Sequence, residues 1–557
     1  MDSSLLNFPW LTTIIFLPLA GVFAVLLSDY RNARSSQVIG LVFSSLTLLL
    51  CLVVVNMFPG TGEMAFTEAH SWIPSLGAKY LLGMDGISLL MVFLTALLTV
   101  LSLIGSWDEF GERSGLFVML MLSLETGVLG VFLALDLLLF YIFWEAMLIP
   151  MYFLIGIYGG PKRFYATTKF VLVTLFGSLL MLLAIAVLAI WHQKQFGAMS
   201  FALADLLKVT LPSDIGWYCC LAFLLAFAIK VPMWPVHTWL PDAHTEAPTA
   251  GSVMLAGVLL KMGTYGMLRF LIPLFPEVIF SIIPWLLGFS VIAIIYGSLT
   301  AMVQQDIKRL VACSSVSHMG FVTLGIFSLT PIGLMGGTVQ MVNHGISTGA
   351  LFLMAGMIHH RTHTRIIDEL GGLAKAMPVF STIFVFFCFS SIGLPGLNGF
   401  IGEFLILLGA FSVSKKFTAV AALGIVLGAV YLLWMVQRVI FGPLKGLGAA
   451  HGNDSHAAHD SHAPKNSHDD HSHESACVSN EHDLNFREFA ALLPLIIGVL
   501  YIGIYPTPVI DLARPPVKKI LSGYQERLKL DTESTKNKST IQAPNNKVPQ
   551  GGEEGTK

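Results

Sequence analysis

The sequence predicts an all-α integral membrane protein with about fourteen transmembrane helices. Three observations support this fold class. Hydrophobic residues make up 55% of the 557 positions and charged residues only 12%, whereas a soluble protein carries about 25% charged residues. Apolar stretches of roughly 20 residues, the length that crosses a bilayer, recur along the chain. Two of these stretches place Pro or Gly clusters beside ionisable residues, which predicts two broken helices.

The expected spans, in chain order, cover residues 9–28, 37–58, 84–106, 114–134, 136–158, 166–191, 216–240, 248–272, 277–302, 308–328, 331–359, 378–410, 417–441 and 488–506. No Lys or Arg precedes the first span and no A-x-A site follows it, so we expect an uncleaved helix rather than a signal peptide. The stretch at 378–410 is too long and too rich in glycine to form one straight helix.

The chain divides into six segments. We expect N-terminal helices 1–3 at 1–113, a first antiporter-like repeat at 114–272, a second at 277–441, a polar insertion at 446–483, a last helix at 486–510 and a polar tail at 511–557. The repeats follow from spacing, because 85 residues separate Glu145 from Lys230 and also His318 from Glu403. Interrupted spans at matching positions of two halves are typical of inverted-repeat transporters.

Charged loops predict an orientation. Loops after odd-numbered spans hold Arg31, Arg34, Arg113, Lys162, Arg163, Lys169, Lys308, Arg309, Arg361, Arg365 and Lys375, while the others hold Lys79, Lys194, Lys208, Arg269, Lys415 and Lys416. By the positive-inside rule, the N-terminus is periplasmic and the polar insertion cytoplasmic. The net charge of −2 implies no nucleic-acid partner.

Four ionisable residues lie inside expected spans: Glu145, Lys230, Lys261 and Glu403. An isolated charge at the bilayer centre costs at least about 2.5–3.5 kcal/mol. Structural ion pairs are one explanation, but desolvation offsets most of the attraction in a buried pair. We therefore favour a proton relay, in which burial and a neighbouring charge move the pKa of a Lys towards neutrality.

Histidines extend this set. His318 and His344 lie within spans and can transfer protons near neutral pH, although an intramembrane histidine can also be a hydrogen-bonded tie between helices. His237 and His244 flank the kinked segment PVHTWLPDAHTEAPT. They form either a secondary proton path or caps of the broken helix, and the sequence does not separate these roles.

The polar insertion is rich in histidine: His451, His456, His459, His462, His468, His471, His473 and His482. A zinc or nickel site is one interpretation. A solvated insertion is the one we favour, because the irregular spacing specifies no coordination geometry. We therefore predict no metal site. The six cysteines show no CxxC spacing, and no nucleotide-binding glycine motif occurs.

Glu145, Lys261, His318 and Glu403 lie in four longer motifs: VPMWPVHTWLPDAHTEAPTAGSVMLAGVLLKMGTYGMLRF, QQDIKRLVACSSVSHMG, FYIFWEAMLIPMYFLIGIYGG and GLPGLNGFIGEF. Lys230 directly precedes the first of them. Together they resemble the antiporter-like membrane subunits of respiratory complex I, over about residues 1–510. The acid at Glu403, where L- and N-type subunits carry Lys, favours the M-type branch, as does the run IPMYFLIGIYGG. Cys313 departs from the usual Tyr, and the histidine-rich insertion is not a family feature.

The resemblance implies a fold of fourteen helices with two inverted five-helix repeats. It implies that Glu145 and Lys230 are a modulating pair, and that Lys261 passes protons through His318 and His344 to Glu403. The implied function is proton translocation coupled to electron transfer from NADH to quinone. FMN, iron–sulfur clusters, NADH and quinone are expected in partner subunits, and no cofactor in this chain.

The implied partners are the L- and N-type antiporter-like subunits and membrane lipid, in the inner (plasma) membrane of a bacterium. Two other functions remain open at this point: a subunit of a cation/proton antiporter, and a membrane subunit of a membrane-bound hydrogenase or formate hydrogenlyase. Glu403 argues against the antiporter. Co-purification with flavin-containing subunits would indicate the NADH:quinone oxidoreductase, and co-purification with a nickel–iron hydrogenase would indicate the hydrogenase complex.

Overall fold

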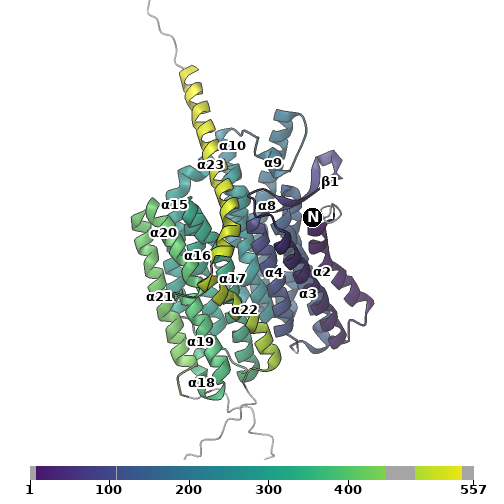
Figure 1. Ribbon diagram of the computed structural model, residues 1–557, viewed down its shortest axis with the longest axis vertical. Coiled ribbons are helices and arrows are strands. Elements are labelled where there is room, and N and C mark those ends of the chain that lie inside the picture. The colour runs from purple at the N-terminus through teal and green to yellow at the C-terminus, as the bar shows by residue number, and fades with distance from the viewer. Residues whose placement is uncertain (1–7, 108, 444, 446–482, 542–557) are drawn as a thin grey trace, which may run out of the picture.

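Long apolar helices joined by short loops make up most of the structure, a computed structural model that describes residues 8–107, 109–443, 445 and 483–541 (Figure 1). Within these residues, thirteen helical stretches are long and apolar enough to cross a membrane. Two shorter apolar helices, α19 (Pro378–Ile392) and α20 (Asn398–Val413), form one further, broken span. The predicted class of an all-α membrane protein is confirmed, and so is the break within 378–410.

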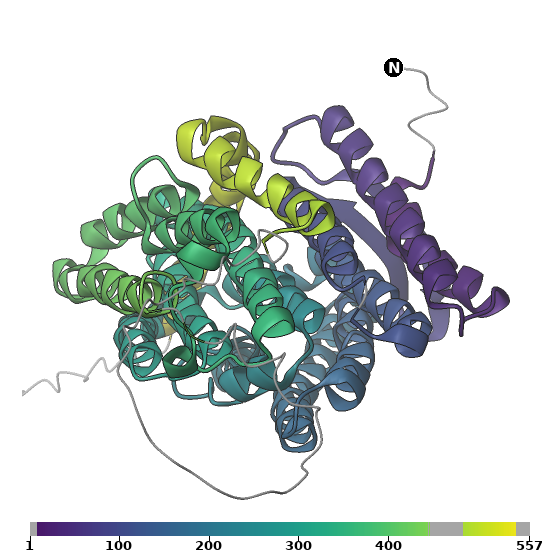
Figure 2. The same ribbon diagram turned by 90° about the horizontal axis from the view of Figure 1, so that it is seen from below.

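The unbroken helices are α2 (Trp10–Leu27), α3 (Ala33–Met57), α4 (Gly86–Gly105), α5 (Ser114–Leu133), α8 (Arg163–Phe196), α15 (Pro276–Met302), α16 (Ile307–Phe327), α17 (Pro331–Thr362), α21 (Lys415–Val439), α22 (Phe486–Ile504) and α23 (Thr507–Ile541). Short helices α9 (Leu203–Leu206) and α18 (Leu373–Ala376) and 3-10 turns η1 (Pro74–Leu76), η2 (Gly111–Arg113) and η5 (Ile367–Glu369) lie in the connections. Seen along the helices, the N-terminal helices form one flank, while α22 and α23 lie on the periphery of the bundle (Figure 2).

An antiparallel hairpin, which the sequence analysis did not predict, joins α3 to α4. It consists of β1 (Ala65–Ile73) and β2 (Ala78–Met84), with Gly77 between the strands at a φ of 71°. Glu68 on β1 accepts hydrogen bonds from the backbone N–H groups of Leu11 (2.7 Å) and Thr12 (3.1 Å). The carboxylate thus satisfies donors at the start of α2, where an acid is favoured. The end of the bundle that carries this hairpin is called the hairpin side below.

Two helices break where the sequence places proline or glycine. The segment α10 (Ser213–Lys230) ends just before Pro232, and α11 (Trp239–Glu246) resumes after it. The Trp239 indole N–H donates to the Ile229 carbonyl at 2.8 Å, which satisfies one acceptor freed by the break. Gly393, at a φ of 82°, ends α19 in the left-handed conformation that favours glycine. The span from residue 137 is also divided, into α6 (Leu137–Ala146) and α7 (Leu148–Tyr158).

The span that carries Lys261 is buried at every position from 250 to 272. It runs through α12 (Thr249–Met254), η3 (Leu255–Leu259), α13 (Leu260–Gly266), η4 (Met267–Leu271) and α14 (Ile272–Leu274), and η3 and η4 are π-helical. Single π turns within α-helices occur frequently at functional sites. Lys261 lies in the short α-helical piece between them. The sequence analysis predicted one regular helix here.

Two charges counted as loop residues are in fact buried in helices. Arg269 lies in η4 with 6% of its surface exposed, and Lys308 lies at the start of α16 with 5% exposed. Lys308 donates a hydrogen bond to the Ala247 carbonyl. The expectation that they are solvated loop charges was wrong, because tertiary packing covers the ends of these helices.

The C-terminal region closes over the bundle. A capping box formed by Asn485 and Glu488 begins α22, and Glu488 also accepts from Arg361 of α17 at 2.8 and 2.5 Å. Next, α23 crosses the bundle and projects beyond the hairpin side (Figure 1). The sequence analysis treated 511–557 as a polar tail, whereas residues up to Ile541 continue this helix.

Replacing Glu488 by alanine tests the tie between α22 and α17. The change removes a two-point carboxylate partner from the Arg361 side chain, which is 13% exposed, and we expect a loss of about 2–4 kcal/mol. Thermal unfolding of the purified protein should shift to lower temperature. Glu63→Ala is the control, because its pair with Lys519 is largely exposed and should contribute little. Equal shifts for the two variants would contradict this role of Glu488.

Candidate functional site

Glu145 and Lys230, predicted as a pair, lie on neighbouring helices of the first half. Lys230 ends α10 with 1% of its surface exposed. Its Nζ contacts the Met147 sulfur at 3.7 Å and lies 5.6 and 5.4 Å from the rings of Trp144 and Phe170. Glu145 is half-buried, and Lys230 acts on its carboxyl electrostatically without a direct ion pair among the described residues. The two charges are coupled through space rather than joined by a hydrogen bond.

Lys261 lies at the centre of the bundle and is fully buried. Its Nζ donates to the Ala256 carbonyl at 2.5 Å and is 2.7 Å from His344 Nδ1. Ala256 belongs to the π-helical stretch η3, so the irregular backbone places one of its carbonyls within reach of the ammonium group. His344 comes from the middle of α17, which packs against this span. The structure thus brings together two residues that are 83 positions apart in the sequence.

The run continues from His344 to Glu403. The rings of His344 and His318 have centroids 5.7 Å apart. His318 Nδ1 is 3.2 Å from a Glu403 carboxylate oxygen, and its Nε2 is 3.2 Å from Ser391 Oγ. His318 and Glu403 are 7% and 4% exposed. All four predicted residues from Lys261 to Glu403 therefore form one polar run, which leads from the span of Lys261 through α17 and α16 to α20.

A small cavity lies between the two histidines. Its volume is about 10 Å³, close to the smallest volume that accommodates one water molecule. His318, His344 and Ser391 line it together with Asn343. The Nε2 atom of His344 has no hydrogen-bond partner in the described part of the chain. The space between the two rings is thus an interval of this run that one water molecule could bridge.

Sequence reasoning missed a group of uncharged polar residues around the second break. Asn398 begins α20, and its Oδ1 accepts from Ser390 at 2.6 Å. The Asn343 amide donates to the Asn398 carbonyl at 2.7 Å, and Gln340 donates to Glu403 at 3.4 Å. These bonds hold the start of α20, and hence Glu403, against α17. The available signal was the presence of Asn, Gln and Ser within apolar spans, next to His344 and the Gly-rich break.

His237 and His244 make no direct contact with this run among the described residues, although His244 interacts electrostatically with Lys261 and His344. His237, 7% exposed, meets Tyr296 edge to face at 5.1 Å between ring centroids. His244 is fully buried and stacks on Phe352 at 4.8 Å. Neither ring nitrogen of His244 has a hydrogen-bond partner among the described residues. The ring of His244 therefore caps no helix among the described residues, and the role of both histidines, in a proton path or at the broken helix, stays a prediction.

The metal site considered for the histidine-rich insertion falls on residues 451–482, outside the described residues. Within the described part of the chain, no group of three or more His, Cys, Asp or Glu side chains could hold a metal ion.

The arrangement suits proton transfer rather than bond chemistry. Lys, His and carboxyl groups alternate along a buried run, and each of them can both accept and release a proton. An imidazole can take a proton on one nitrogen and release it from the other, so it moves a proton without moving itself. Lys261 lies in α13 and Glu403 in α20, and the span that contains α20 is broken shortly before Glu403.

Comparison with known proteins agrees with this geometry. The family described as "NADH:quinone oxidoreductase/Mrp antiporter, TM" matches residues 134–428. NADH-quinone oxidoreductase subunit M of Pseudomonas aeruginosa is 41% identical, over 91% of this chain and 95% of the relative. Subunit M of Rhodobacter capsulatus is also 41% identical, over 93% and 97%.

Among solved structures, respiratory complex I from Thermus thermophilus with bound NADH contains a chain that matches with a TM-score of 0.78 and 32% identity. The match covers 92% of this chain and 99% of the other. The family match covers more than half of this chain, and the named relatives match it nearly end to end. The chain belongs to the family of NADH:quinone oxidoreductase and Mrp antiporter membrane subunits, and within it to the M-subunit branch of respiratory complex I.

Proposed function

We propose that this chain translocates protons as the M-type membrane subunit of NADH:quinone oxidoreductase, through Lys261, His344, His318 and Glu403. The observation that carries the proposal is the contiguous buried run of these four residues. The antiporter and hydrogenase alternatives have less support, because the named relatives at 41% identity are M subunits of the quinone-reducing complex.

The proton steps follow from the contacts. A protonated Lys261 donates to His344 Nδ1, 2.7 Å away, and becomes a neutral amine. His344 then releases a proton from Nε2 towards His318, across a space that one water molecule fits. His318 passes a proton from Nδ1 to the Glu403 carboxylate at 3.2 Å. Glu403 finally releases the proton. Before the next cycle, Lys261 takes up a new proton, and each imidazole returns its remaining N–H to the nitrogen that carried it before.

Glu145 and Lys230 supply the switch in this proposal. At an effective dielectric constant of about 20, a unit charge about 4 Å away contributes about 4 kcal/mol. A charge farther away contributes less energy. Its sign still matters, because a nearby anion favours protonation of a lysine and a nearby cation opposes it. Movement of Glu145 towards or away from Lys230 would change the charge state of Lys230, and this change would pass through the buried spans to Lys261.

Partner subunits and the membrane complete the proposed assembly. The subunit carries no redox group itself, and FMN, iron–sulfur clusters, NADH and quinone act in partner subunits. Its membrane neighbours are the L- and N-type subunits. The membrane is the inner membrane of a bacterium, with the N-terminus periplasmic and the histidine-rich insertion cytoplasmic. We favour a solvated insertion over a metal site.

Substituting either member of the switch tests it. We expect Glu145→Ala and Lys230→Ala each to reduce coupled NADH:quinone turnover and proton pumping strongly, by about tenfold or more, because each leaves its partner without a compensating charge. Pumping is measured in vesicles that contain the whole complex, at matched assembly. Lys162→Ala changes an exposed cation and serves as the control. Normal pumping by either switch variant removes that residue from the mechanism.

Three substitutions of Glu403 test the relay itself. Glu403→Asp keeps a carboxyl and should retain part of the pumping. Glu403→Gln keeps the size but cannot titrate, so most pumping should be lost. Glu403→Lys should retain substantial activity, because a basic group can also accept and release a proton.

A purely structural ion pair with His318 predicts the reverse order for these variants. The neutral isostere Gln would then be tolerated, and Lys would be worst because it repels a protonated His318. Proton pumping per NADH, compared at equal assembly, decides between the two. The relay proposal fails if the Gln variant equals the wild type while the Lys variant is inactive.

A further inference from the structure

Arg269 and Asp85 form a buried ion pair that the proton run does not use. An Arg269 guanidinium nitrogen lies 2.5 Å from Asp85 Oδ2, and the two side chains are 7% and 2% exposed. Asp85 directly follows β2 and caps α4, since its Oδ1 accepts from Ser88 N–H at 3.0 Å. The pair is therefore fixed at the hairpin side of the bundle, between α4 and the π-helical stretch η4.

Tyr265 connects this pair to the span that carries Lys261. Its hydroxyl donates to the Phe132 carbonyl at 2.9 Å and accepts from Arg269 Nε at 3.2 Å. Ser88 Oγ lies 3.1 Å from the same hydroxyl. Asp85, Ser88, Tyr265 and Arg269 together form what we term the Asp85–Arg269 wall. The polar atoms of these four residues bind to one another or to nearby backbone, so none of them depends on Lys261 as a partner.

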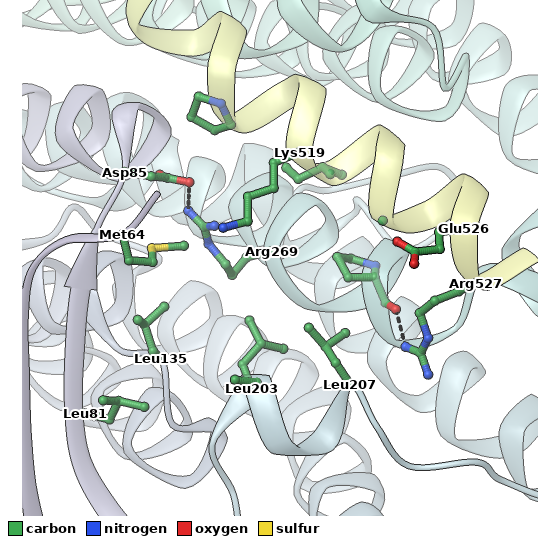
Figure 3. A pocket seen from close by; sticks show the side chains of 15 residues that line it. Met64, Leu81, Asp85, Leu135, Leu203, Leu207, Arg269, Lys519, Glu526 and Arg527 are labelled. Carbon is green, nitrogen blue, oxygen red and sulfur yellow. Dashed lines mark hydrogen bonds and ion pairs between the residues drawn. The ribbon is translucent and has the colours of Figure 1, made fainter. Parts of the chain in front are cut away.

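A cavity of about 450 Å³ lies on the far side of the wall (Figure 3). The hairpin contributes Leu81, α9 contributes Leu203 and α23 contributes Lys519. The Lys519 side chain is 53% exposed, so the cavity reaches the protein surface. Asp85 and Arg269 line the cavity from the inside. On the other side of the wall, Lys261 precedes Arg269 by eight residues of helix, a rise of about 12 Å.

The wall and the proton run differ in hydrogen bonding. In the wall, the Tyr265 hydroxyl and the Asp85 carboxylate have partners at their donor and acceptor positions. In the run, His344 Nε2 has none among the described residues. A proton hop needs an acceptor that is free to receive it, and an arginine cannot be deprotonated. Fixed arginine charges exclude protons in other membrane pores.

We propose that the Asp85–Arg269 wall is an electrostatic barrier that isolates Lys261 from the cavity on the hairpin side, so that a proton at Lys261 does not leave through that cavity. The inference rests on the proposed proton-translocating function. A structural role alone explains the pair poorly, because a buried ion pair contributes little net stability compared with apolar residues of the same size. Here Arg269 lies on the span that carries Lys261 and, together with Asp85, lines a cavity that reaches the surface.

The experiment compares proton leak with coupled turnover in sealed vesicles that contain the whole complex. Arg269→Gln removes the fixed charge and should let an imposed pH gradient, in the absence of NADH, decay up to about tenfold faster, the effect of one unit charge at about 12 Å and a dielectric constant of about 20. Protons pumped per NADH should fall, while NADH oxidation stays near the wild-type rate. Arg269→Lys retains a cation and should restore most of the barrier.

Controls separate a leak along the relay from a general opening. Lys519→Gln removes a cation from the same cavity and should leave the gradient stable. The double variant Arg269→Gln/Lys261→Ala should lose the leak, because the path then lacks its central group. Arg269→Met, which also lacks the fixed charge, replaces Arg269→Gln if the latter does not assemble and should leak to a similar extent. Asp85→Asn keeps an acceptor for Ser88 N–H and leaves Arg269 as an uncompensated cation, so its gradient should decay no faster than that of the wild type.

Three results overturn the inference. They are a wild-type gradient decay in assembled Arg269→Gln or Arg269→Met, a leak in Lys519→Gln equal to that of Arg269→Gln, and a leak that persists in the double variant. Failure of the proposed function has a different signature. In that case Glu403→Gln pumps normally, whatever the leak of Arg269→Gln.

Discussion

The short contact between Lys261 and His344 is the interaction on which the rest of this structure depends. An ammonium group at the centre of a bilayer is costly unless polar partners surround it. Here one partner is a side chain of another helix, and the other is the Ala256 carbonyl of its own span. The second partner requires irregular backbone, which is tolerated in a membrane only where protein buries it. The complete burial of this span is thus the condition for a lysine at its centre.

The two helix breaks serve the same requirement in different ways. Pro232 ends α10 directly after Lys230, so this lysine lies at a helix terminus, where carbonyl dipoles favour a cation. Gly393 ends α19, and the restart at Asn398 places Glu403 in the second turn of α20. Here Asn343 and Gln340 of α17 supply the hydrogen bonds that the break would otherwise leave open. Charged residues and helix breaks occur together because a break leaves backbone groups that can bind a charge, and the polar residues around the charge satisfy the other groups that the break leaves free.

The sequence was most informative where a residue conflicts with its surroundings. Glu145, Lys230, Lys261 and Glu403 stand out because a charge in an apolar run has few explanations, and Pro232 and Gly393 locate the breaks. The π-helical stretches could not be predicted, since they follow from packing between spans rather than from local preference. The network around Asn398 was missed because uncharged polar residues are common in spans. Arg269 was misassigned because charges near the ends of spans usually lie in solvent, whereas here Asp85, from a distant part of the chain, receives it.

The ion pair between Lys519 and Glu63 joins residues 456 positions apart, and this separation bears on how the protein is made. Helices enter the membrane in order as the chain leaves the ribosome, so the hairpin, α4 and the span with Arg269 meet long before α23 is synthesised. The part of α23 that lines the hairpin-side cavity is therefore the last of its lining segments to be synthesised. Until α23 is made, the Asp85–Arg269 pair lacks the cover of this helix, although all of its own hydrogen-bond partners have already been synthesised.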